Sequence, residues 1–246
     1  LISIDPSLSA RLLKIANSSF YNFSSQIDSL GRAVNIIGTE DLFNLALATS
    51  TPSTFSKLNN NDNIDIGTYW RHSVMTGLIG RSLTKECSLR RSESLFLAGL
   101  FHNLGQLVVL EQLPELFIKI EELKNATDAP WKIEKDVLGY TYGAVSAELL
   151  KCWKMPLNII ELVQTQHDPV LSSDPLSAAL LHIASRTASQ LEYNKLFGFD
   201  FNETIYPAAW AVTRLSEENL NSAVESAELN CHAMLTAMTG KQMQAA

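Results

Sequence analysis

Apolar residues recur along most of this chain at the spacings of three and four that are typical of amphipathic helices. The clearest repeat lies near the C-terminus and runs from Leu220 to Met238. Asp5-Pro6 and Asp174-Pro175 each combine an N-capping side chain with a proline suited to the first helical turn. Alternating segments bounded by turn residues, which would indicate strands, do not occur. The pattern therefore predicts an all-α fold.

Breaks in this pattern predict where helices end. Pro52 is expected to end the helix that starts at Thr39, and Gly105 to end the one that starts at Ser92. The polar segment 59–63 (NNNDN) has no helical period and is the best candidate for a hinge. We therefore expect a small N-terminal helical subdomain over residues 1–58. A larger helical bundle with C-terminal helices should follow over residues 59–246.

Composition narrows the class of protein. The 246 residues are 46% hydrophobic and 18% charged, which is enough apolar material for a packed core. The net charge is −7 and basic residues do not cluster, so nucleic acid is not an expected partner. We see no apolar run of membrane-spanning length, and the three scattered cysteines form neither a disulfide framework nor a zinc pair. A cytoplasmic protein that contacts no membrane is therefore expected.

His102 stands out because an amide, Asn103, follows it inside an otherwise apolar stretch. A His-Asp pair here would offer two adjacent metal ligands, whereas asparagine is neutral and is a poorer ligand for such cations. His72 and His167 lie on two other predicted helices, a layout typical of sites built from inward-facing residues of a helical bundle. The alternative is that each histidine is a hydrogen-bonded residue of the core.

Several segments, in order, resemble the HDOD family, the HD-related output domain of bacterial signalling proteins. They are residues 4–18 (IDPSLSARLLKIANS), 27–34 (IDSLGRAV), 36–38 (IIG), 70–73 (WRHS), 98–105 (AGLFHNLG), and a later block from Gly139 to Pro156 that is followed by His167. The resemblance covers roughly residues 2 to 195. So many motifs in the right order are far more specific than a single pattern match. The larger part of the chain is therefore expected to be an HD-like bundle.

The resemblance also implies where a site would lie. The related HD phosphohydrolases hold one or two metals with histidines and aspartates, and a metal-activated water attacks a phosphoester. Two of the expected aspartates are replaced here, one by Asn103 and one by Ser185, and Tyr142 stands where many relatives have histidine. The positions that match the family's site are His72, His102, Asn103, Tyr142, His167 and Ser185.

The loss of both carboxylates changes what this site is expected to hold. Three neutral histidines can bind a zinc ion with water, but they are a poor cage for two divalent cations. We therefore expect no catalytic residue and no cofactor. If a divalent metal is bound, His72, His102 and His167 are its expected ligands. Asp168 or Glu134 could approach such a metal, although Glu134 is expected instead to cap or pair at a helix start.

These considerations favour a non-catalytic bacterial signal-transduction module that acts by binding another protein or a small ligand. Other signalling proteins are the expected partners, and a nucleotide is one candidate ligand. The alternative is a metal-dependent phosphohydrolase of the HD superfamily that acts on a nucleotide or a cyclic dinucleotide. A third reading is a nucleotide-binding sensor without catalysis. The resemblance leaves enzymatic activity open, and the missing carboxylates argue against it.

Overall fold

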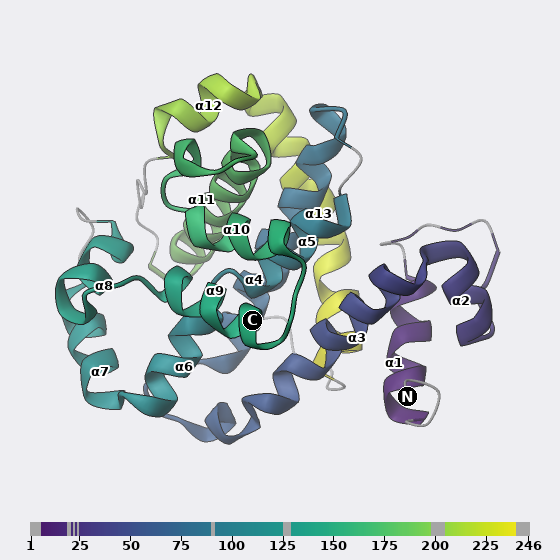
Figure 1. Cartoon of the computed structure of the whole chain (residues 1–246), viewed down its shortest axis with the longest axis horizontal. Helices are drawn as coiled ribbons and strands as arrows, with labels where there is room; N and C mark the ends of the chain where they lie inside the picture. Colours follow the sequence, from purple (N-terminus) through teal and green to yellow (C-terminus); the bar gives the residue numbers. More distant parts are fainter. Residues whose placement is uncertain are drawn as a thin grey trace. The chain divides into compact units, whose positions relative to one another are not determined.

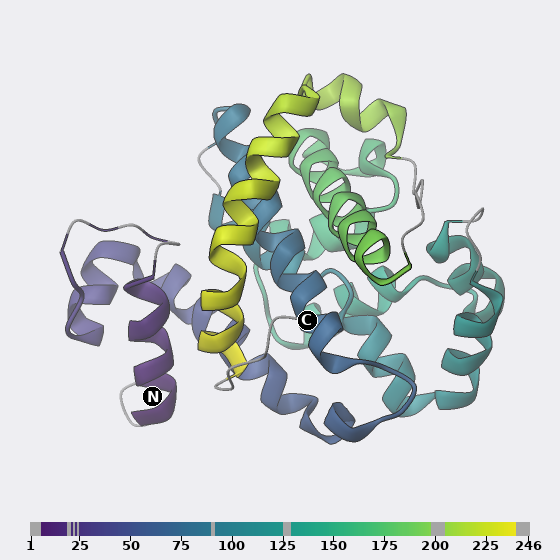
Figure 2. The ribbon, with the colours of Figure 1, turned by 180° about the vertical axis from the view of Figure 1, so that it is seen from behind.

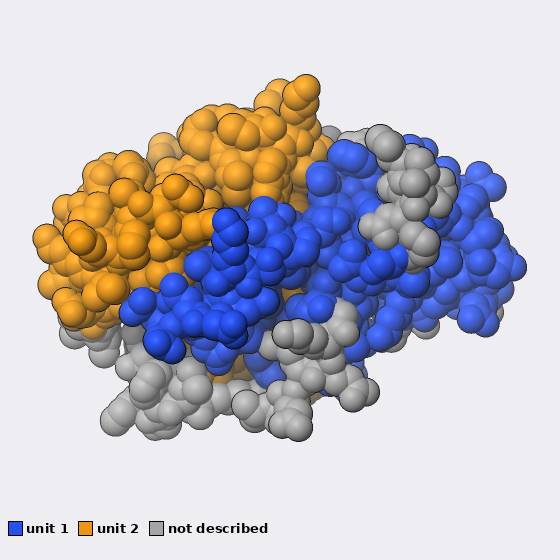
Figure 3. Space-filling view, turned by 90° about the horizontal axis from the view of Figure 1, so that it is seen from below, with its two compact units in different colours: residues 1–71, 227–246 blue, residues 72–226 orange. Residues whose placement is uncertain are grey.

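The computed structural model describes residues 6–18, 21, 23, 25–89, 92–124, 129–197 and 205–239. Within these ranges all regular secondary structure is helical and no strand occurs, which confirms the all-α fold (Figure 1). The chain divides into two compact units, unit 1 with residues 1–71 and 227–246, and unit 2 with residues 72–226 (Figure 3). The boundary that we expected after residue 58 stays a prediction.

Unit 1 is built from short helices and from parts of two long ones. Its elements are α1 (Pro6–Ala16), α2 (Leu30–Ile37), α3 (Thr39–Thr54), the 3-10 helix η2 (Ser56–Asn60), the start of α4 (Ile66–Glu86) and the end of α13 (Glu217–Thr239). Helices α1, α2 and α3 pack against one another. The side chain of Asn17 bonds both the N–H and the carbonyl of Ile27, each at 2.7 Å, and so fixes the extended segment before α2.

Unit 2 contains the rest of α4, the start of α13 and the elements between them. These are α5 (Ser92–Phe101), α6 (Leu104–Gln112), α7 (Pro114–Leu123), α8 (Pro130–Leu138), α9 (Tyr142–Cys152), α10 (Leu157–Thr165), η3 (Pro169–Leu171), α11 (Pro175–Phe197) and α12 (Pro207–Thr213). Helix α9 packs against α6 and α10, and α5 packs against α10 and α11. The long helix α11, green in Figure 2, also contacts α12 and η3. Most of these helices bury apolar residues, which form the core of the unit.

The two expected helix ends were both wrong by a few residues. Helix α3 continues through Pro52 and ends at Thr54, so the proline lies within the last turn and the helix ends two residues beyond it. Gly105 lies inside α6, and the break falls earlier, at His102 and Asn103. The N–H of Gly105 donates to Ser146 Oγ at 2.8 Å. Because Gly105 has no side chain, the carbonyl of Tyr142 on α9 can lie close to its backbone.

One segment corrects the expectation that no apolar run reaches membrane-spanning length. Residues Ser92–Gln112 are together long and apolar enough to cross a membrane, by length and composition only. In the structure they form two helices, α5 and α6, and 72% of the apolar window is buried inside the protein. The burial of these side chains in the core of unit 2 therefore accounts for their apolar character.

Candidate functional site

The site begins with a contact between two histidines from neighbouring helices of unit 2. His72 lies on α4 and His102 follows the last turn of α5, and their Nε2 atoms are 3.1 Å apart. His102 is only 3% exposed, and its Nδ1 lies 2.6 Å from the carbonyl oxygen of Gly99. Because a carbonyl can only accept, Nδ1 of His102 carries the proton and Nε2 carries a lone pair.

Glycines explain how these two helices come close enough for the histidines to meet. A Cβ atom on Gly99 would lie 2.5 Å from the backbone of Gly77, and one on Gly77 would lie 2.6 Å from the carbonyl of Phe96. Helices α4 and α5 therefore touch backbone to backbone at this point, which only residues without a side chain permit. His102 lies one turn beyond Gly99 and so faces α4 at short range.

A carboxylate that the sequence analysis missed completes this cluster. Glu192 of α11 places Oε2 3.3 Å from Nδ1 of His72, and both side chains are largely buried. Glu192 lies seven residues after Ser185, about two helical turns, and so lies on the same side of α11 as the expected aspartate position. That spacing was a signal in the sequence which could have identified it.

Asn103 does not join the histidine pair. It is the residue before α6, and its Nδ2 donates to Oε1 of Gln106 at 2.7 Å. This bond keeps the amide within the first turn of its own helix. Asn103 thus follows His102 in the chain, but its side chain bonds to a residue of α6 and not to the histidines.

Ser185 is buried on α11, and beside it lies a second residue that the sequence analysis missed. Arg186 is only 6% exposed, and its Nη2 donates to Ser185 Oγ at 3.1 Å. Its guanidinium carbon lies 4.7 Å from the ring centre of Trp131 on α8, a cation–π distance. The position of the expected aspartate is therefore occupied by a neutral hydroxyl that accepts a bond from a buried cation.

Arg186 also acts on the surrounding histidines. Burial is the main reason why the pKa values of His102 and His167 lie well below the ordinary value, and the positive charge of Arg186 lowers both further. The pKa of His182 falls to about 4 for the same two reasons in the same order. These three imidazoles are therefore neutral at neutral pH.

His167 lies after α10 and stacks on Trp131, with ring centres 4.9 Å apart and planes at 8°. Its Nδ1 is buried and has no hydrogen-bond partner in the part of the chain that the structure describes. Among the described residues it makes no hydrogen bond to His72 or His102. The structure thus joins two of the three expected histidines directly and holds the third against an aromatic ring.

Tyr142 is the first residue of α9 and is only 1% exposed. Its N–H donates to Oε2 of Glu134 at 2.7 Å, which confirms that Glu134 serves at a helix start. Burial raises the pKa of Glu134 to about 7 and also raises that of the Tyr142 hydroxyl, which lacks a hydrogen-bond partner among the described residues. Tyr142 therefore belongs to the packed interior.

Gln166 and His182 connect the end of α10 to the rest of the unit. Gln166 Nε2 donates to the carbonyl of His102 at 2.9 Å, and a side chain on Gly143 would collide with it. His182 Nδ1 lies 2.7 Å from the carbonyl of Gln166, and its Nε2 accepts from the N–H of Tyr206 at 3.0 Å. Both nitrogens of His182 are thus used by the backbone.

The ligand atoms present decide whether the metal ions implied by the family resemblance fit this site. Two Nε2 atoms 3.1 Å apart resemble a pair of ligands, because nitrogens on one tetrahedral zinc lie about 3.3 Å apart. No third donor accompanies them: among the residues that the structure describes, no three His, Cys, Asp or Glu side chains are grouped to hold a metal. Buried Arg186 adds positive charge. These residues do not fit a two-metal centre, which needs anionic ligands.

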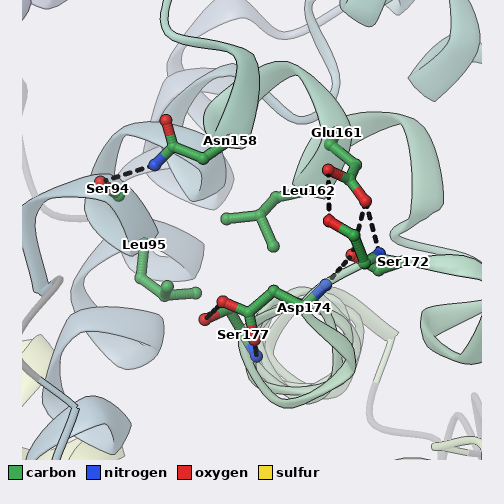
Figure 4. A pocket seen from close by; sticks show the side chains of 9 residues that line it. Ser94, Leu95, Asn158, Glu161, Leu162, Ser172, Asp174 and Ser177 are labelled. Atoms are coloured by element: carbon green, nitrogen blue, oxygen red, sulfur yellow. Dashed lines mark hydrogen bonds between the residues drawn. The ribbon is translucent and has the colours of Figure 1, made fainter.

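A separate small pocket of about 70 Å³ lies between α5, α10 and the start of α11 (Figure 4). Glu161 accepts hydrogen bonds from the hydroxyls of Ser172 and Ser173, and Asp174 accepts from Ser177. These bonds secure the turn that leads into α11. None of the six residues predicted for the site lines this pocket.

Comparison with known proteins places the chain in a family. The family model described as HDOD domain matches residues 1–169. An uncharacterized protein of Treponema pallidum (strain Nichols) is 24% identical over 170 residues, which make up 68% of this chain but only 32% of that relative. The chain thus spans about a third of the length of this curated relative.

Solved structures share the fold. The "Putative phosphohydrolase" of Shewanella amazonensis SB2B has a TM-score of 0.70 at 21% identity, over 98% of this chain and 85% of that one. The "Putative signal transduction protein" of Marinobacter aquaeolei VT8 has a TM-score of 0.69 at 23% identity, over 99% of this chain and 54% of that one. Because the family model covers more than half of the sequence, the chain belongs to the HDOD domain family.

Proposed function

We propose that this chain is a non-catalytic regulatory module of bacterial signal transduction. The observation that carries the proposal is the buried guanidinium of Arg186, which lies beside the position of a lost aspartate. A fixed cation inside the site opposes the binding of divalent metal ions, since like charges repel strongly in a medium of low polarity. Without metal ions, the chemistry of the related phosphohydrolases has no activated water.

The two replaced positions support the same conclusion. Asn103 bonds to Gln106 and Ser185 to Arg186, so each side chain has a role that keeps it out of a metal shell. The scaffold of the family is retained while its carboxylates are not. We therefore infer that the fold was kept for binding and not for hydrolysis.

The partner is proposed to be another signalling protein, and a nucleotide is the candidate small ligand. The solved relative from Marinobacter aquaeolei is named for signal transduction, which is consistent with this class of function. We propose that the protein acts in the cytoplasm and binds neither nucleic acid nor membrane, in line with its net charge of −7.

The proposed mechanism is conformational. Helices α4 and α13 each contribute residues to both units. A change in unit 2 can therefore be transmitted to unit 1 along these continuous helices. Binding of a ligand or partner would shift the population between two arrangements of these helices. Hydrogen exchange should then change in both units on binding, and unchanged protection across either unit would refute the mechanism.

Metal content and hydrolysis test the proposal directly. The purified protein should contain less than stoichiometric metal by elemental analysis, and it should not hydrolyse nucleotides or cyclic dinucleotides with added manganese. Arg186→Asp supplies a matched variant, because it exchanges the opposing cation for a ligand-type carboxylate. Metal binding by this variant but not by the unaltered chain would support the role given to Arg186.

A metal-dependent phosphohydrolase acting on a nucleotide is the second candidate, and one observation favours it. The Nε2 atoms of His72 and His102 converge at 3.1 Å, a separation suited to two ligands of one ion. Stoichiometric metal in the unaltered protein, together with turnover that is lost in His102→Ala, would replace the regulatory proposal with this one.

A further inference from the structure

A tryptophan from a peripheral helix lies against two residues of the site. Trp131 is the second residue of α8, which packs against α7 at the edge of unit 2 (Figure 1). Its indole stacks on the imidazole of His167, with ring centres 4.9 Å apart and planes at 8°. The guanidinium carbon of Arg186 lies 4.7 Å from the centre of the same side chain's ring. One side chain of α8 therefore contacts the end of α10 and the middle of α11.

The exposure of these residues shows that the indole is the outer layer. Arg186 is 6% exposed, and Ser185, which accepts a hydrogen bond from it, is 1% exposed. Trp131 is only half-buried. A ring that touches both solvent and a buried guanidinium covers that cation. A ligand that approaches Arg186 from this side must therefore move the indole.

The first turn of α8, which carries Trp131, is weakly anchored. Its N-cap residue is Ala129, which has no side-chain oxygen to accept from the first backbone N–H groups. One turn further along, Glu134 accepts the N–H of Tyr142 and ties α8 to α9. The end of a helix opens more easily than its middle. The first turn can therefore move Trp131 away while Glu134 keeps the rest of α8 in place.

The two contacts of the indole select a class of ligand. An imidazole ring and a guanidinium group both favour the face of a planar aromatic ring. Indole is a fused five- and six-membered ring and so has nearly the outline of a purine, whereas a pyrimidine has a single ring. Nucleobases stack on histidine and arginine side chains in the same manner. A phosphate joined to the base would also be attracted by the positive charge of Arg186.

We propose that Trp131 occupies the place of a purine base, and that a purine nucleotide binds against His167 and Arg186 by displacing the indole. The proposal uses the ring face of His167, so it does not depend on which nitrogen carries a proton. It rests on the regulatory function proposed above, for which a nucleotide is the candidate ligand, and adds the class of base and the residue that competes with it. Binding would release the first turn of α8, and a partner protein could detect that movement.

Trp131→Ala tests the competition. The variant should bind indole, which should raise its thermal unfolding midpoint, and it should bind AMP at least about tenfold more tightly than the unaltered chain, because the competing state is gone. CMP should gain clearly less. Equal affinities of the variant and the unaltered chain for AMP, or an equal gain for CMP, would overturn the proposal.

Trp153→Ala is the matched control for this variant. Trp153 is also a half-buried tryptophan of unit 2, and it packs edge-on against Phe101 with ring centres 6.2 Å apart. Its loss should leave the affinity for AMP unchanged. A gain as large as that of Trp131→Ala would show that loosening of the fold, and not removal of a competitor, admits the nucleotide.

Fluorine NMR of the unaltered sequence, labelled with 5-fluorotryptophan, gives a result that does not depend on how the alanine variant folds. Trp131→Phe assigns the Trp131 signal among the four tryptophans. Millimolar AMP should shift this signal and leave that of Trp153 in place. Binding of AMP without a shift, or no binding to either protein, would refute the displacement of Trp131 and leave the non-catalytic function intact. Stoichiometric metal together with turnover would instead overturn that function.

Discussion

At the scale of single residues, one buried cation affects several groups of the site. Arg186 donates to Ser185, lies over Trp131 and lowers the pKa values of His102, His167 and His182. A lone arginine in a predicted helix gives no sign in the sequence that it will be buried. Its role depends on which side of α11 faces the core, and the low amphipathicity of that helix did not reveal this side.

Removing this charge should be visible at a neighbour. In Arg186→Gln the pKa of His182 should rise above about 4, but it should stay below the ordinary value because burial is the larger cause. An NMR titration of His182 measures this. Arg81→Gln, which removes an arginine paired with Glu93, is the control and should leave the titration unchanged. An unaltered pKa in Arg186→Gln would contradict the electrostatic account.

Two hydroxyls in the same region should respond in opposite ways. The Tyr142 hydroxyl is buried without a hydrogen-bond partner among the described residues, so Tyr142→Phe should raise the free energy of unfolding by about 1 kcal/mol. Ser146 Oγ accepts from Gly105 N–H and donates to the Tyr142 carbonyl. Ser146→Ala should therefore lower stability by about 1–3 kcal/mol. Urea unfolding measures both, and equal effects would contradict the assignment.

At the scale of helices, the contact between α4 and α5 sets the geometry of the histidine pair. Gly99→Ala would place a methyl group against the backbone of Gly77, so it should lower stability by roughly 3 kcal/mol or more. Gly80→Ala on α4 is the matched control, because its new methyl would meet Ala184 at an ordinary 3.6 Å. It should be neutral or stabilising, as alanine favours helix. Similar losses in both variants would argue against the close contact.

The positions of the helices could be predicted from the sequence, whereas the contacts and roles of particular residues could not. The periodic spacing and the Asp-Pro starts placed most helices, because amphipathicity is a local property. Whether Gly105 ends a helix depends on what approaches it, and here the carbonyl of Tyr142 does. The neighbourhood of His72 and His102 followed from the family resemblance. Glu192 escaped notice because its partner lies 120 residues earlier in the chain.

At the scale of the molecule, the buried neutral histidines should make the fold acid-sensitive. Their folded pKa values lie below the unfolded value near 6.5, so stability is fully present above pH 6.5. It falls as the pH drops from about 6.5 toward 4, where His182 itself titrates. Each such group contributes about 1.4 kcal/mol per pH unit within this window.

Glu134 acts in the opposite sense. Its folded pKa, about 7, lies above the ordinary carboxyl value, so its burial weakens the fold as the pH rises from about 4.5 to 7. The histidines outnumber it, and a net loss toward acid is expected. Urea midpoints measured from pH 7.5 to 4 test this, and His182→Gln should flatten the slope. A stability that is constant or rises toward acid would refute the prediction.

The cation of Arg186 has a consequence for how this domain is regulated. A bound metal ion can be removed by a chelator, or lost when the cell is short of that metal. A domain that needs the ion then responds to the amount of metal available. A guanidinium is part of the polypeptide and cannot dissociate. We therefore expect the folded state to be indifferent to metal availability, so that the signals it receives must arrive as molecules or partners.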